Sequence, residues 1–144
     1  MSRHIKFDHE FIGREGLEKL ADGPHRKKVW LRWNDEDVLR VLGSQLGSGE
    51  RYKYMETPNA YYAILPFDKV TSGGQTVGLS TYTVYTANVR SWFSLAMIDE
   101  AAAVDGAEVS VTWGEEGGGS AKPVVERHVQ TDIRATISSE RLNA

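Results

Sequence analysis

The stretch Phe11-Ile12-Gly13-Arg14-Glu15-Gly16-Leu17 and the stretch Lys27-Lys28-Val29-Trp30-Leu31-Arg32-Trp33 decide how this chain is organised. In the first stretch the apolar residues have helical spacing, which predicts a short helix. In the second stretch Val29, Leu31 and Trp33 alternate with their neighbours, which predicts a strand with one preferred face. The chain is therefore expected to run from a helix directly into a strand.

Two helices are expected around this strand. The first covers residues 11–21 and ends at Asp22-Gly23-Pro24, because glycine followed by proline is a strong helix terminator. Asn34 is a good N-cap for the second helix, and the carboxylates at 35–37 suit the positive end of the helix dipole. Gly43 is expected to end this second helix.

After residue 50 the sequence has the composition of β structure, because it is rich in valine, threonine and aromatic residues. The expected strands are 60–65, 76–86, 92–98, 107–113 and 128–137, and the last of them has apolar residues in alternation. A turn is expected over 68–75 and a flexible hairpin over 114–120. With residues 27–33 this gives six strands and two helices, a mainly β (α+β) fold that is either a small antiparallel barrel or a sandwich.

Length and composition fit one domain. The 144 residues are expected to form a flexible N-terminal arm over 1–10 and a folded domain over 11–144. A net charge of −3 does not favour nucleic-acid binding, and no apolar run is long enough to span a membrane. The chain has no cysteine, which excludes disulfides and thiolate chemistry. We expect a cytoplasmic protein without nucleic-acid or membrane partners.

Three short motifs have the residue types of known sites without the necessary surroundings. Glu126-Arg127-His128 could place two metal ligands on one strand face, but zinc requires a third ligand nearby, so no metal site is expected. Gly117-Gly118-Gly119-Ser120 is not followed by the helix of a phosphate loop, so a hairpin is favoured. Ser48 is not part of a nucleophile elbow, and no catalytic residue is assigned.

The candidate binding residues surround one predicted hairpin. Tyr85 and Trp92 lie on its two strands, and Asn88 and Arg90 lie in or next to the connection between them. An aromatic surface beside one arginine could hold a flat, carboxylated ligand by stacking and ion pairing. Ordinary β packing with an arginine at the rim is the alternative.

Several segments, in order, match one known family. They are 8–15, 26–38, 77–81, 87–96, 111–115, 122–123 and 125–128. On these segments the chain resembles the C-terminal barrel domain of the glycine cleavage T-protein (aminomethyltransferase) superfamily. Phe11-Ile12-Gly13-Arg14 marks the superfamily, and the later segments resemble its tetrahydrofolate-dependent aryl O-demethylases of the vanillate and syringate type.

The resemblance implies a six-stranded barrel that packs on two catalytic, folate-binding domains. Those domains have no counterpart in this sequence, so no catalytic residue is carried over. Tetrahydrofolate is the implied cofactor, bound only together with the missing domains. Tyr85, Asn88, Arg90 and Trp92 are the expected cofactor-binding residues, at the rim of the folate channel.

Two functions follow from this reading. In the first, the chain is an accessory or split subunit for one-carbon (methyl) transfer and needs a separate chain that carries the catalytic domains. It is then not expected to be catalytic alone. In the second, it is a non-catalytic barrel module that binds a ligand or forms a homo-oligomer. A truncated reading frame without an independent role also stays open.

Overall fold

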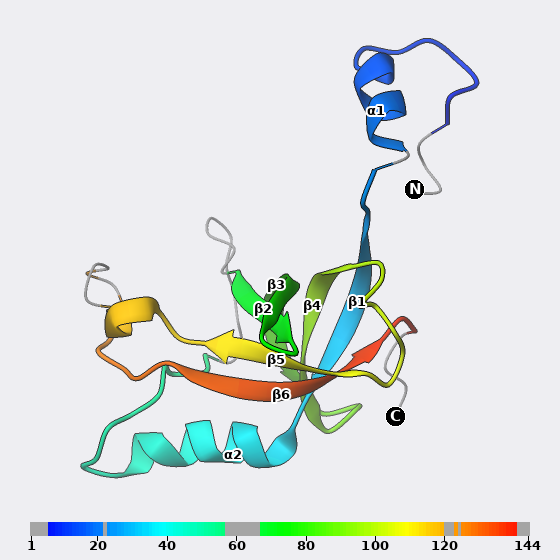
Figure 1. The fold of residues 1–144 in the computed structure, drawn as a ribbon. Helices are drawn as coiled ribbons and strands as arrows, with labels where there is room; N and C mark the ends of the chain where they lie inside the picture. Colours follow the sequence, from blue (N-terminus) through cyan, green and yellow to red (C-terminus); the bar gives the residue numbers. More distant parts are fainter. Residues whose placement is uncertain (1–5, 22, 57–66, 120–122, 124, 141–144) are drawn as a thin grey trace.

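The structure, a computed structural model, describes residues 6–21, 23–56, 67–119, 123 and 125–140. Six antiparallel strands form a closed barrel in the order β1-β4-β3-β2-β5-β6 (Figure 1). The strands are β1 (Arg26–Trp33), β2 (Asp68–Ser72), β3 (Gln75–Thr86), β4 (Ser91–Asp99), β5 (Glu108–Trp113) and β6 (Thr131–Ser138). The predicted six-stranded antiparallel barrel with two helices is therefore confirmed.

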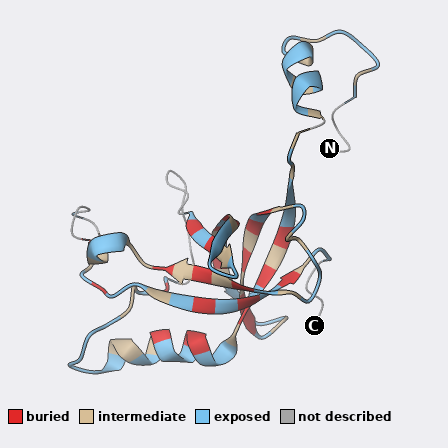
Figure 2. Ribbon diagram, in the orientation of Figure 1, coloured by how far each residue is buried: buried red, intermediate tan, exposed pale blue. Residues whose placement is uncertain are grey.

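The alternation of β1 places its apolar side chains inside the barrel. Val29, Leu31 and Trp33 are almost completely buried. The same alternation of buried and more exposed positions recurs along β4, β5 and β6 (Figure 2). Each fully buried aliphatic or aromatic side chain contributes about 1.5–3 kcal/mol to stability, so this interior is the main stabilising feature of the fold.

A small polar group lies within this apolar interior. The indole Nε1 of Trp33 donates to the Ser94 hydroxyl at 3.0 Å, and the Ser80 hydroxyl donates to the same oxygen at 2.8 Å. Both serines are completely buried. The three side chains tie β1, β3 and β4 together, because each buried polar group depends on the others for its hydrogen bond.

Helix α2 (Asp35–Gly43) follows β1 directly and runs beside β6 in Figure 1. The Asn34 side chain accepts a hydrogen bond from the backbone N–H of Asp37 at 3.1 Å, so the predicted N-cap is confirmed. Val38 and Val41 face the core and are buried. Gly43 is the last helical residue, as predicted, before a short 3-10 turn over Ser44–Leu46.

Helix α1 (Arg14–Ala21) projects away from the barrel at the start of β1 (Figure 1). It begins three residues later than predicted and ends where predicted. None of its residues is buried, and Ile12 just before it is fully exposed. Arg14 forms ion pairs with Glu10 and Glu18, at 2.7 and 2.8 Å.

The prediction of a turn over 68–75 is wrong, because residues 68–72 form β2. Val70 is completely buried and pairs with Gly78 on one side and Val111 on the other. A strand with charged residues at Asp68 and Lys69 lacks the continuous β-forming composition that sequence reasoning looks for. Only Gly73 and Gly74 form the turn, both at positive φ. The predicted strand over 60–65 lies outside the described residues.

The last strand begins later than predicted, at Thr131 instead of residue 128. His128 and Val129 precede it, and Val129 makes an isolated parallel bridge to Tyr52. Among the described residues, no helix is both long and apolar enough to cross a membrane.

Candidate functional site

The β3–β4 hairpin brings the four predicted binding residues to one end of the barrel. Tyr85 pairs with Trp92 across the hairpin, and their ring centroids lie 6.2 Å apart at an interplanar angle of 52°. The Trp92 ring is buried at 8% exposure, whereas Tyr85 is 45% exposed. Asn88 and Arg90 are exposed in the connecting turn. The hairpin therefore offers one accessible aromatic ring supported by a buried one.

Two residues of this hairpin have an unusual backbone conformation. Tyr82 and Arg90 have φ angles of 52° and 51°, and they are the non-glycine residues with positive φ among those described. Such a conformation costs about 1–2 kcal/mol for an ordinary residue. Strained residues with functional side chains are frequent at binding sites, so the strain favours a site at this hairpin.

Tyr82 lies in a β-bulge that sequence reasoning missed. Thr81 pairs with Leu95 and Val84 pairs with Phe93, so two residues of β3 lie opposite the single residue Ser94. The regular alternation of faces along β3 is therefore interrupted at this point. Tyrosine is a normal strand residue, and no local sequence signal marks the bulge.

The site is only partly assembled by the residues that the structure describes. Tyr85 and Trp92 are in ring contact, whereas Arg90 makes no side-chain hydrogen bond or ion pair with a described residue. Its guanidinium group is therefore available to a ligand carboxylate.

The Glu126-Arg127-His128 motif has a structural role. The His128 Nε2 accepts the backbone N–H of Glu115 at 2.7 Å, so Nδ1 carries the proton and donates to the Glu126 carbonyl at 2.8 Å. The Glu126 carboxylate accepts the backbone N–H of Tyr54 at 2.7 Å. Within the described ranges, no three His, Asp or Glu side chains are grouped to hold a metal ion.

The glycine-rich stretch after β5 packs against the same histidine. Residues Glu116–Gly119 form a short 3-10 turn instead of a plain hairpin, with Gly117 and Gly118 at positive φ. A Cβ atom at Gly118 would collide with the His128 carbonyl oxygen. These glycines therefore allow a close backbone approach, which explains them without a phosphate ligand.

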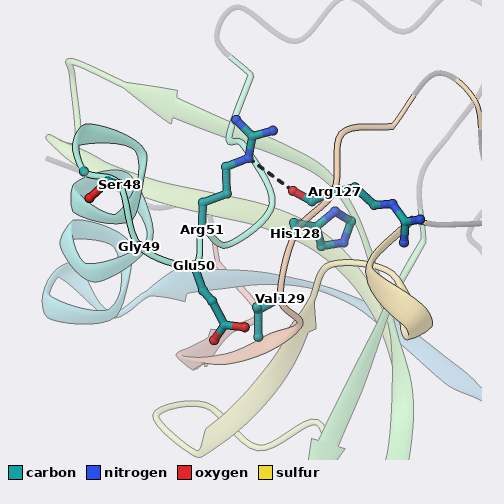
Figure 3. A pocket seen from close by; sticks show the side chains of 8 residues that line it. Ser48, Gly49, Glu50, Arg51, Arg127, His128 and Val129 are labelled. Atoms are coloured by element: carbon teal, nitrogen blue, oxygen red, sulfur yellow. Dashed lines mark hydrogen bonds between the residues drawn. The ribbon is translucent and has the colours of Figure 1, made fainter.

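A cleft of about 420 Å³ lies elsewhere, between the loop after α2 and the segment before β6 (Figure 3). It is lined by Gly47, Ser48, Gly49, Glu50, Arg51, Arg127, His128 and Val129. Sequence reasoning identified the loop but not the cleft, because the two walls are brought together by the bridge between Tyr52 and Val129.

The cleft does not gather groups for chemistry. Arg51 Nε donates to the Arg127 carbonyl at 3.1 Å, and both nitrogens of His128 are already hydrogen-bonded. In Figure 3 the guanidinium groups of Arg51 and Arg127 point in different directions. The hairpin site is therefore the better candidate.

The sequence has relatives among curated proteins. Over 134 residues, which are 93% of the chain, it is 48% identical to syringate O-demethylase from Sphingobium sp. (strain NBRC 103272 / SYK-6). The chain is similar to part of an O-demethylase. The predicted resemblance to O-demethylases of the syringate type is thereby confirmed, and the match covers 29% of that relative's length.

A more distant relative is sesamin methylene transferase from Sinomonas sp. (strain No.22), which is 30% identical over 131 residues. This match covers 81% of the chain and 28% of the relative. The chain thus spans less than a third of the length of the O-demethylase and of the methylene transferase. No protein-family model matches the chain.

Proposed function

We propose that this chain is a non-catalytic barrel unit for one-carbon (methyl) transfer, acting together with a catalytic, folate-binding part. The observation that carries the proposal is the 48% identity to syringate O-demethylase along almost the whole barrel. We further propose that both belong to the glycine cleavage T-protein superfamily and that the cofactor is tetrahydrofolate.

In this proposal the β3–β4 hairpin contacts the cofactor. The exposed ring of Tyr85, supported by the buried Trp92, fits a flat ligand that stacks on an aromatic surface. The guanidinium of Arg90, which pairs with no described side chain, fits a ligand carboxylate, and the exposed amide of Asn88 can add a hydrogen bond. The residue types at the hairpin therefore suit a flat carboxylated molecule such as tetrahydrofolate.

Tetrahydrofolate would accept the methyl group of the aryl ether when bound. The residues of this barrel would bind and orient it, because a methyl acceptor must be held in line with the bond that breaks. The hairpin would also exclude water from one end of the channel. Proton transfer to the departing phenol is assigned to the catalytic part and not to this chain.

The partner in the proposal carries the catalytic part, whether on a separate chain or on the same polypeptide. The alternative function is a non-catalytic ligand-binding or self-associating barrel. Helix α1 supports this alternative, because none of its residues is buried and exposed apolar side chains such as Leu20 commonly mark a protein–protein contact.

Calorimetric titration with tetrahydrofolate tests the proposal, both on the chain alone and after addition of the catalytic part of an O-demethylase as a separate chain. We expect Arg90→Gln to weaken binding by about tenfold, because a charge-assisted hydrogen bond is worth about 1.5 kcal/mol or more. The matched control is Arg127→Gln, an exposed arginine in another segment, which should leave the affinity unchanged. Equal affinities of Arg90→Gln and the unaltered chain would refute the hairpin site.

A further inference from the structure

The outer surface of the barrel carries an apolar patch of two exposed and three half-buried side chains. Leu79 and Met97 pair directly across β3 and β4 and are 37% and 43% exposed. The next outward-facing pair in the register is Trp30 with Leu95, followed by Phe93, whose ring lies 5.2 Å from that of Trp30. We call the five side chains Trp30, Leu79, Phe93, Leu95 and Met97 the outer face.

Cations border the outer face on both sides. Lys28 is the register partner of Met97 on β1, and Lys69 is the register partner of Leu79 on β2. One row across four strands therefore reads lysine, methionine, leucine, lysine. Arg32 lies further along β1 and donates to the Ser91 hydroxyl at 3.3 Å. No carboxylate of the described residues forms an ion pair with Lys28, Arg32 or Lys69.

The segment of residues 8–21, which leads into and includes helix α1, has the complementary properties. Leu17, Leu20 and Ala21 form an apolar stripe at helical spacing, and Leu20 is 65% exposed. Residues 8–21 carry four carboxylates, Asp8, Glu10, Glu15 and Glu18, against the two cations Arg14 and Lys19. A helix of eight residues is marginal in water without a surface to pack on.

The dimensions of the two surfaces also match. Lys28 and Lys69 are separated by three strand spacings of about 4.8 Å, or roughly 14 Å across the sheet. A helix with its side chains is about 10–12 Å wide, so α1 fits between the two lysines. Figure 1 shows α1 directed away from its own barrel, so α1 does not cover the outer face of the same copy.

We propose that the occupant of the outer face is α1 of a second copy of this chain. In a symmetric dimer each copy places its α1 on the outer face of the other, which is an isologous exchange of the same element. The apolar stripe of α1 covers Leu79 and Met97, and the carboxylates of residues 8–21, which exceed the cations of that segment by two, approach the bordering lysines. The inference does not depend on the proposed role in methyl transfer.

Sedimentation analysis of the chain at about 100 µM tests the exchange, since a micromolar Kd would make most of the chain dimeric at that concentration. We expect a dimer that weakens as salt is added, because the bordering ion pairs are screened. Met97→Glu should give a monomer. The matched control Val104→Glu, at an exposed apolar residue outside the outer face, should stay dimeric.

Charge reversal tests the arrangement itself. Lys28→Glu/Lys69→Glu places an acidic border around the outer face, and Glu10→Lys/Glu18→Lys makes the helix segment basic. Each double variant alone should be monomeric, because each confronts like charges. A mixture of the two should be dimeric, because each helix then meets a face of opposite charge.

Leu17→Glu separates loss of the dimer from loss of folding. No residue of α1 is buried, so the barrel does not need this side chain to fold. We expect this variant to be monomeric with the circular dichroism of the unaltered chain. A monomeric chain at every concentration overturns the inference. So does a dimer that persists in Leu17→Glu and Met97→Glu, or a charge-reversed mixture that stays monomeric.

Discussion

Asp37 in α2 accepts two hydrogen bonds from the Arg134 guanidinium in β6, with Nε 2.9 Å from Oδ2 and Nη2 3.2 Å from Oδ1. Its Oδ2 also accepts the backbone N–H of Arg134 at 2.9 Å. The Asp37 side chain is 12% exposed. The hydrogen bonds from Arg134 hold the pKa of Asp37 below its ordinary value, against the opposing effect of burial. One carboxylate thus fastens α2 to the barrel.

This pair predicts a pH-dependent stability. The folded-state pKa of Asp37 lies below the unfolded value of about 3.9, so its contribution is present above that value and is lost as pH falls through the folded pKa. Asp37→Asn should lower the free energy of unfolding at pH 7 by about 1–3 kcal/mol. Urea unfolding from pH 7 to pH 3 should show this difference shrinking at the acid end. Asp35→Asn, an exposed neighbour, is the control, and a difference that is constant with pH would contradict the assignment.

Arg90→Gly should stabilise the isolated chain. Glycine adopts a φ of 51° without a Cβ penalty, and its greater freedom in the unfolded state offsets part of the gain. We expect a rise of up to about 1 kcal/mol in the free energy of unfolding. Asn88→Gly is the control. Asn88 is not at positive φ, so this substitution relieves no backbone strain and should not raise the free energy of unfolding. Loss of stability in Arg90→Gly would show that the arginine side chain itself supports the turn.

Gly118→Ala should destabilise the chain by about 2 kcal/mol or more, because the new Cβ meets the His128 carbonyl and φ is +65°. Gly49→Ala is the matched control, since a Cβ there has no atom within 4 Å and φ is not positive. Thermal unfolding of both variants measures the contrast. If both substitutions cost the same, the glycine-rich turn does not need its close approach to His128.

Ser94→Ala should cost about 1–3 kcal/mol, because it leaves the buried indole N–H of Trp33 without an acceptor. Ser110→Ala, at a half-buried serine of β5, should change stability little. Chemical unfolding of both variants, with tryptophan fluorescence as the readout, gives the comparison. An equal and small cost at both serines would mean that the indole finds another acceptor.

The barrel could be predicted where apolar alternation is strong, and less where it is weak. β1 could be predicted from the alternation of Val29, Leu31 and Trp33, and the start of α2 could be predicted from Asn34. In both cases the local pattern agrees with the tertiary environment. β2 was missed because only Val70 in it is a buried hydrophobe, and its strand conformation depends on pairing with β3 and β5.

The surroundings of the candidate site could also be predicted only where the local sequence determines them. The hairpin that joins Tyr85 and Trp92 was predicted from neighbouring strands, because a short connection pairs them. The bulge at Tyr82 was not predicted, because it arises from the register against β4. The cleft beside Arg51 was not predicted, because residues far apart in sequence form its walls.

The position of β1 between β4 and β6 has a consequence for how this chain folds. The register joins Trp30 to Ser138, so the first strand is completed only when the last one arrives. During synthesis, β1 leaves the ribosome well before β6. Until β6 is made, the edge of β1 that pairs with β6 has no partner strand. Barrel closure across so large a sequence separation is slow compared with local hairpin formation. Among the described strands of this barrel, β1 would therefore wait longest for its second neighbour, and a chaperone that binds nascent chains could bind it during that time.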